Sequence, residues 1–163
     1  LYQIAETKEE KRFYFSKAIE NYFSSIFKQT LYTELELYMD SHPDFDAESL
    51  SIEYEKLTKA YYGPQVIYDE STFTEWTFHT RLYSWNYDDY RSATGLLMAS
   101  AVVHNYVDQK LLKEEDYIHF LSAGSSKYSS ELLKMIQIDW DQPENIDRGF
   151  EILKQAVHEF EKV

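Results

Sequence analysis

The sequence contains no cysteine, only four glycines and three prolines, and no apolar run near the ~20 residues that cross a membrane. Without cysteine the chain can form no disulfide, no thiol nucleophile and no cysteine-ligated metal site. Positive charge is also scarce: 16 Lys and Arg stand against 29 Asp and Glu, a formal net charge of −13. Because nucleic-acid phosphates select basic surfaces, and because no signal peptide heads the chain, we expect a cytoplasmic protein that binds neither nucleic acid nor membrane.

Aromatic residues, by contrast, are abundant. The 163 residues include 15 Tyr, 10 Phe and 3 Trp, or 17% of the chain. Disordered acidic segments are poor in aromatic residues, and this length suits one folded domain. We therefore expect a single helical domain over residues 1–163. The open question is which tyrosines pack in the core and which take part in chemistry.

Apolar residues recur at intervals of three and four, which predicts helices along the whole chain. A capping box at residues 7–10 begins a helix that meets no Gly or Pro before Pro43, so it should end near Asp40. A second helix should be capped by Asp46 or Ser49 and stopped at Gly63. Further helices are expected over about 71–83, 93–112, 114–123 and 130–135, and from Pro143 to the end. The sequence thus predicts an all-α fold, an antiparallel helical bundle with one long N-terminal helix.

Recognisable catalytic motifs are sparse. The five histidines are scattered and form neither H-E-x-x-H nor a pair at i, i+4. Asp88 and Asp89 are adjacent, so on a helix they would not share a face, and they are interpreted as a helix cap or solvated turn. Glu34 and Glu36 are interpreted as a solvated face. No metal site is expected within this chain.

One cluster of hydrogen-bonding side chains stands out before the Ala-Thr-Gly of residues 93–95. Within twelve residues it contains His79, Tyr83, Trp85, Tyr87 and Tyr90. Several such donors on one wall could orient a substrate carbonyl and stabilise an oxyanion. The alternative is an aromatic packing cluster whose hydroxyl groups remain in water at its rim.

Four segments resemble, in order, the tail of the oligoendopeptidase F group of thimet-type zinc oligopeptidases. The first two are FKQTLYTELE at 27–36 and AYYGP at 60–64. They are followed by the His- and Tyr-rich segment 76–95, and by YIHFLSAGSS at 117–126 with ELLK at 131–134. Each motif alone is weak, but four in register through nearly the whole chain are fairly specific.

The resemblance implies that this chain is the C-terminal helical part of a larger enzyme. Such enzymes hold zinc with H-E-x-x-H and a Glu from the next helix, and the motif Glu activates a zinc-bound water. Those residues would lie upstream of Leu1, so the parent would carry Zn and this fragment none. The partners implied are short peptide substrates and the N-terminal remainder of the same enzyme, and the fragment alone would be inactive.

The resemblance also implies which residues form the substrate wall. Tyr90, Tyr87, Tyr83 and His79 are the candidate catalytic donors. The same three tyrosines, with Gly95, are the candidate substrate-binding residues. Their role would be to hydrogen-bond the substrate backbone and the tetrahedral intermediate.

The segment departs from the family pattern in places. Alignment on residues 93–95 puts the family His at Leu82 and two family tyrosines at Asp88 and Ser92. Alignment on Trp76 puts the same His at Arg81 instead. These departures favour a second reading, in which the chain is a non-catalytic helical binding or interaction module that keeps the fold.

Overall fold

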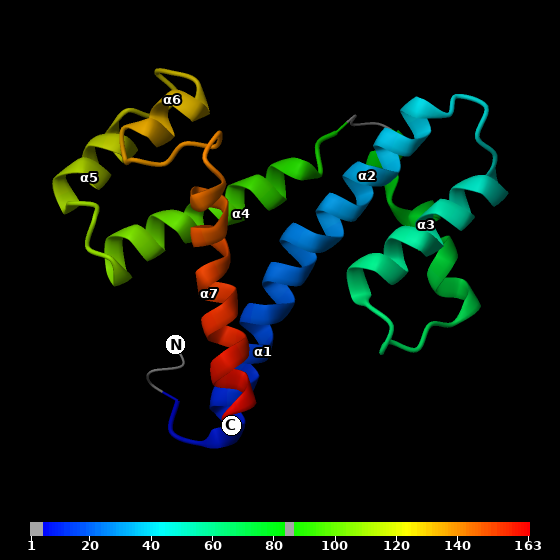
Figure 1. The fold of residues 1–163 in the computed structure, drawn as a ribbon, viewed down its shortest axis with the longest axis horizontal. Helices are drawn as coiled ribbons and strands as arrows, with labels where there is room; N and C mark the ends of the chain where they lie inside the picture. Colours follow the sequence, from blue (N-terminus) through cyan, green and yellow to red (C-terminus); the bar gives the residue numbers. More distant parts are fainter. Residues whose placement is uncertain (1–4, 84–86) are drawn as a thin grey trace. The chain divides into compact units, whose positions relative to one another are not determined.

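The computed structural model describes residues 5–83 and 87–163. Within these ranges the chain forms helices and loops and no β-strand, which confirms the all-α prediction (Figure 1). The described α-helices are α1 Lys8–Tyr22, α2 Lys28–Ser41, α3 Ala47–Tyr62, α4 Tyr90–Val103, α5 Glu114–Ser122, α6 Ser129–Lys134 and α7 Pro143–Glu161. Shorter π or 3-10 segments are η2 Phe23–Phe27, η3 Glu70–Phe78, η4 Thr80–Tyr83 and η5 His104–Asp108.

The predicted long N-terminal helix is present as α1, η2 and α2 in succession. It begins with the expected capping box: the Thr7 hydroxyl accepts the Glu10 N–H, and the Glu10 carboxylate accepts the Thr7 N–H, both at 3.1 Å. The π-helical turn η2 interrupts the regular α-helical hydrogen bonding without ending the helix. Periodicity alone does not reveal such a turn.

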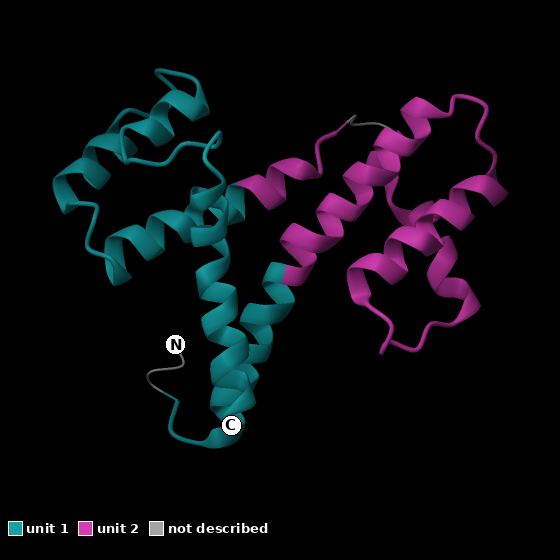
Figure 2. Ribbon diagram, viewed as in Figure 1, with its two compact units in different colours: residues 1–22, 95–163 teal, residues 23–94 magenta. Residues whose placement is uncertain are grey.

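The chain divides into two compact units, coloured separately in Figure 2. Unit 1 comprises residues 1–22 and 95–163, and unit 2 comprises residues 23–94. The first division falls at the start of η2, and the second falls within α4. Each unit has its own packing.

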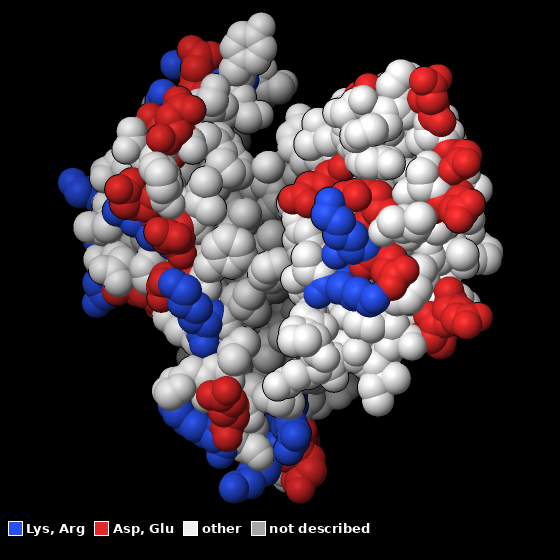
Figure 3. Space-filling model, turned by 45° about the vertical axis from the view of Figure 1, so that its right-hand side comes forward, with Lys and Arg blue, Asp and Glu red and all other residues white. Residues whose placement is uncertain are grey.

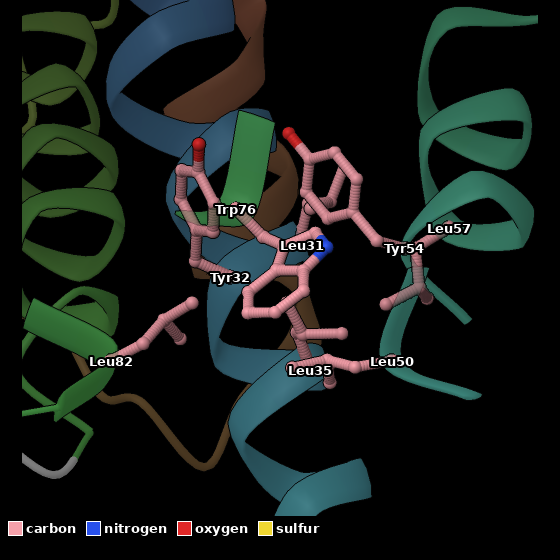
Figure 4. Close-up of a cluster of buried hydrophobic side chains, with 8 residues drawn as sticks. All are labelled: Leu31, Tyr32, Leu35, Leu50, Tyr54, Leu57, Trp76 and Leu82. Atoms are coloured by element: carbon pink, nitrogen blue, oxygen red, sulfur yellow. The ribbon is translucent and has the colours of Figure 1, made fainter. Parts of the chain in front are cut away.

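Unit 2 is built on a hydrophobic cluster where α2, α3 and the 3-10 segments meet (Figure 4). Its buried members are Leu31, Tyr32, Leu35, Leu50, Tyr54, Leu57, Trp76 and Leu82. Burying a large apolar side chain stabilises a fold by about 1.5–3 kcal/mol. In Figure 4 the hydroxyl groups of Tyr32 and Tyr54 lie at the same end of this cluster, away from Leu35 and Leu50. The cluster therefore ends in a polar rim.

The start of α3 is fixed by side-chain caps, as its sequence predicts. The Asp46 carboxylate accepts the Ser49 N–H at 2.8 Å, and the Ser49 hydroxyl accepts the Asp46 N–H at 2.9 Å. At the other end Gly63 has φ +80°, a conformation that costs glycine little.

Replacing Asp46 with alanine should lower the free energy of unfolding by about 1 kcal/mol, because the early N–H groups of α3 lose their acceptor. Asp44→Ala is the matched control: this residue is exposed and lies just outside the cap. Denaturant titration of both variants measures the difference. Equal stabilities would show that the cap contributes nothing.

In unit 1, α1 lies beside α7. The Tyr22 hydroxyl makes a short hydrogen bond with the Ser100 hydroxyl and lies 3.4 Å from the carbonyl oxygen of Gly149. The Arg12 guanidinium sits 4.9 Å from the centre of the Phe160 ring. Tyr22 is thus a packing residue with a satisfied hydroxyl group, in agreement with its place in the helical period.

The segment expected as a third helix forms 3-10 turns. Hydroxyl groups there bond to nearby carbonyls: Thr74 to Ser71 O at 3.0 Å, and Thr77 to Thr74 O at 2.8 Å. Such side-chain bonds compete with the regular α-helical pattern, which accounts for the tighter winding. The consequence for the site is that His79 lies at the end of η3, where the backbone leaves the helical conformation.

Candidate functional site

An open pocket of about 330 Å³ lies in unit 2 beside the polar rim of the hydrophobic cluster. Its walls come from η2, α2 and the end of η3. The lining residues are Ser24, Lys28, Gln29, Tyr32, Glu75, Phe78 and His79. Lys28 and Tyr32 are one helical turn apart on α2, so they share a face. The pocket combines aromatic rings with charged and hydrogen-bonding groups.

His79 is the most firmly held of the predicted site residues. Its ring stacks on Tyr32 with centroids 3.7 Å apart and planes 2° from parallel. Its Nε2 lies 2.5 Å from Oδ2 of Asp89, whose side chain is 1% exposed. The second carboxylate oxygen of Asp89 accepts a hydrogen bond from Arg81 at 3.2 Å. The stacking therefore fixes the plane of the imidazole ring, and the bond to Asp89 fixes the position of Nε2.

A second charged group lines the same pocket. The Lys28 ammonium lies 2.5 Å from Oε1 of Glu75, and Tyr54 donates its hydroxyl hydrogen to Oε2 of Glu75 at 3.3 Å. Burial lowers the pKa of Lys28, but the hydrogen bond to Glu75 and the negative charge nearby together outweigh burial, so the pKa is raised and Lys28 stays charged. Burial also raises the pKa values of Tyr32 and Tyr54. Both phenols remain neutral hydrogen-bond donors over the physiological pH range.

Tyr87 is held at two points by α2. Its N–H donates to Oε1 of Glu36 at 2.9 Å, and its hydroxyl donates to Asp40. Its backbone adopts φ +56°, which is uncommon for a residue other than glycine. The hydrogen bond to Asp40 raises the pKa of Tyr87 to about 12. Tyr87 is thus fixed in an unusual conformation by two carboxylates.

The other predicted site residues are more open. The side chains of Tyr83 and Tyr90 are 60% and 48% exposed. At Gly95 an added Cβ would meet no atom within 4 Å, so nothing in the structure requires glycine there. Trp85 lies outside the described residues. His79 and Tyr87 each bond to a buried carboxylate, His79 to Asp89 and Tyr87 to Glu36.

Two carboxylates that sequence reasoning assigned to solvent are buried. Glu36 is 6% exposed and Asp89 is 1% exposed, so the solvated-face and solvated-turn interpretations were wrong. Asp89 does lie just before α4, as a cap would, but its oxygens bond His79 and Arg81. The helical spacing of Glu36 could have predicted its burial. Glu36 follows the buried Leu35 and lies four and five residues after Tyr32 and Leu31, on the buried side of α2.

Glu36 carries a testable pH dependence. Burial raises its pKa, against the opposing effect of the Tyr87 N–H bond, and its Oε2 is buried without a hydrogen-bond partner. Above the raised pKa the ionised Glu36 therefore lowers the free energy of unfolding. This loss disappears as the pH falls toward the pKa that Glu36 has in the unfolded chain.

Glu36→Gln keeps an acceptor for the Tyr87 N–H but carries no charge. The variant should be more stable than the wild type at pH 7, and its advantage should shrink as the pH falls through the raised pKa. Thermal unfolding of both proteins across this range measures the difference. Glu34→Gln is the control, since Glu34 is exposed on the same helix. A constant difference at all pH values would contradict the assignment.

Charges elsewhere are mixed. On the face shown in Figure 3, acidic and basic side chains are interspersed.

Among the described residues, no three His, Cys, Asp or Glu side chains converge closely enough to hold a metal ion. This chain's described residues therefore do not fit a zinc site. Nor does any helix in the described ranges have the length and apolarity to cross a bilayer.

The sequence matches the family described as Peptidase family M3 over residues 1–152. It is 26% identical to oligopeptidase PepF of Bacillus subtilis over 162 residues, which cover 97% of this chain and 24% of that protein. It is 29% identical to an oligoendopeptidase F homolog of Borreliella burgdorferi over 149 residues, or 89% of this chain and 25% of that protein. The chain thus spans about a quarter of the length of these curated relatives.

The fold is similar to part of a solved structure as well. The crystal structure of oligoendopeptidase-F from Enterococcus faecium matches 98% of this chain and 31% of its own, with a TM-score of 0.87 and 27% sequence identity. The family match, the relatives and the fold agree over nearly the whole chain, so the protein belongs to peptidase family M3.

Proposed function

We propose that this chain is the C-terminal helical part of a zinc-dependent oligoendopeptidase that hydrolyses short peptides. It supplies a substrate-binding and oxyanion-stabilising wall, while residues elsewhere in the parent hold the zinc. The observation that carries this proposal is the likeness to oligoendopeptidase F proteins over 97–98% of the chain but only 24–31% of theirs. We further propose that the parent enzyme is cytoplasmic.

The wall would be formed by His79, Tyr83, Tyr87 and Tyr90, with Gly95 next to a bound peptide. His79 supports this proposal best, because its ring is fixed by Tyr32 and Asp89 before any ligand binds. With the ring already in place, contact with a bound peptide costs no reorganisation of His79. Tyr83 and Tyr90 have exposed side chains that a peptide can reach.

The full-length gene product provides the test. We expect an H-E-x-x-H motif upstream of Leu1, cleavage of a short quenched fluorescent peptide, and loss of cleavage with a zinc chelator. Added zinc should restore the activity. The isolated chain, assayed beside it, should cleave nothing. An upstream sequence without the motif, or chelator-resistant cleavage, would contradict the proposal.

A second candidate function is a non-catalytic helical binding module. The observation in its favour is that Leu82, where one alignment puts the family His, is a buried core residue at 7% exposure. Tyr90→Phe in the full-length protein separates the two functions. An enzyme that uses this hydroxyl group should lose about 1–4 kcal/mol of transition-state stabilisation. A protein with no turnover that still binds peptides through this surface would support the binding module.

A further inference from the structure

Asp89 is the most deeply buried carboxylate of the site, and both of its oxygens are used. Oδ2 lies 2.5 Å from Nε2 of His79, and Oδ1 accepts the Arg81 bond at 3.2 Å. The side chain is 1% exposed, whereas His79 is 18% exposed and lines the pocket. The buried carboxylate of Asp89 thus bonds to the His79 ring, which is partly exposed and lines the pocket.

The bond to Asp89 determines which nitrogen of His79 is free. An ionised carboxylate only accepts hydrogen bonds, so the proton of a neutral ring lies on Nε2, and Nδ1 is left as an acceptor. A second proton would make Nδ1 a donor while Nε2 keeps its bond. Stacking on Tyr32 prevents the ring from tilting, because the planes are 2° from parallel at 3.7 Å.

We propose that Asp89 is a positioning residue that fixes His79 in one tautomer and one plane, with Nδ1 presented to a peptide in the pocket. This inference rests on the proposed peptidase function. Arg81 gives Asp89 a second hydrogen bond, which offsets part of the cost of burying this carboxylate. The role of Asp89 is thereby separate from binding: it acts through His79 and does not itself contact the substrate.

A double-mutant cycle in the full-length enzyme tests the coupling. Asp89→Asn should lower kcat about 10- to 100-fold, the loss typical for removal of the partner that orients a metal-binding histidine, with KM nearly unchanged. In a His79→Gln background the same change should cost little more. Asp88→Asn is the matched control: Asp88 is the neighbouring aspartate and pairs with Arg91 at 2.7 Å. An equal additional loss in the His79→Gln background would overturn the proposal.

A spectroscopic measurement tests the same coupling without turnover. Long-range ¹H–¹⁵N spectra of the full-length protein, labelled at histidine, report the tautomer of each ring, and His79→Gln assigns the His79 signals. We expect Nε2–H in the wild type and a mixture of tautomers in Asp89→Asn. Nδ1–H or mixed tautomers in the wild type would overturn the proposal, even if Asp89→Asn fails to fold. If the parent cleaves no peptide but shows the Nε2–H tautomer, the peptidase function fails while the coupling stands.

Discussion

Replacing Leu82 with histidine should destabilise the protein by about 3 kcal/mol and should not raise peptide turnover. Leu82 is 7% exposed and belongs to the hydrophobic cluster of unit 2, with Trp76 and Leu35. The substitution removes buried apolar surface and places a polar ring in the hydrophobic cluster. Large changes of this kind in a core cost about 2–5 kcal/mol, and an unpaired buried polar group adds about 1–3 kcal/mol.

The matched control is Leu37→His, which makes the same chemical change at a residue on α2 that is 51% exposed. Its stability should stay within about 0.5 kcal/mol of the wild type. Denaturant titration gives the free energies of unfolding, and a fluorescent peptide assay of the full-length protein gives turnover. A stable Leu82→His variant with increased turnover would show that position 82, and not His79, faces the substrate.

Local signals in the sequence predicted the helices well. Asp46, Ser49 and Gly63 bound α3 as expected, and Pro143 begins α7. These signals succeed because caps and breakers act within a few residues, so the sequence contains the whole interaction. The same reasoning did not predict the winding of residues 70–83, where hydroxyl groups compete for backbone carbonyls.

The site was predicted only in part, because its key contacts join distant residues. The motif segment pointed to His79 and Tyr87, but, apart from Asp89, their partners lie elsewhere: Tyr32, Glu36 and Asp40 come from α2. The separation between Tyr87 and Glu36 is 51 residues. No helical period can show that two such residues meet, so Glu36 was assigned to the surface by its charge alone.

Some of the acidic residues that give the chain its net negative charge have a structural role. Among the 29 acidic residues, Glu36, Glu75 and Asp89 hold side chains or backbone of the candidate site in place. Glu36 and Asp89 are buried, and a buried carboxylate is costly unless it is paired. Each of the three carboxylates has at least one hydrogen-bond donor. The bonds they make are directional, so they fix ring planes and backbone in a way that apolar packing alone does not.

Gly149 should be the least replaceable glycine in the chain. A Cβ at this position of α7 would lie 2.7 Å from the carbonyl oxygen of Leu97 and 2.8 Å from its Cδ2. The first of these atoms belongs to the backbone of α4, so it cannot move aside as a side chain can. Glycine here allows α7 and α4 to approach closely within unit 1.

Gly149→Ala should therefore lower the free energy of unfolding by about 1–2 kcal/mol. Overpacking a core typically costs about 1–3 kcal/mol, and the helix propensity of alanine returns only about 1 kcal/mol. Gly95→Ala is the matched control, because it lies in α4 with no atom within 4 Å of an added Cβ. That variant should gain about 0.5–1 kcal/mol from the reduced entropy of the unfolded chain. Thermal and denaturant unfolding of both variants measures the contrast, and a stabilised Gly149→Ala would show that the close approach of α7 to Leu97 is not required.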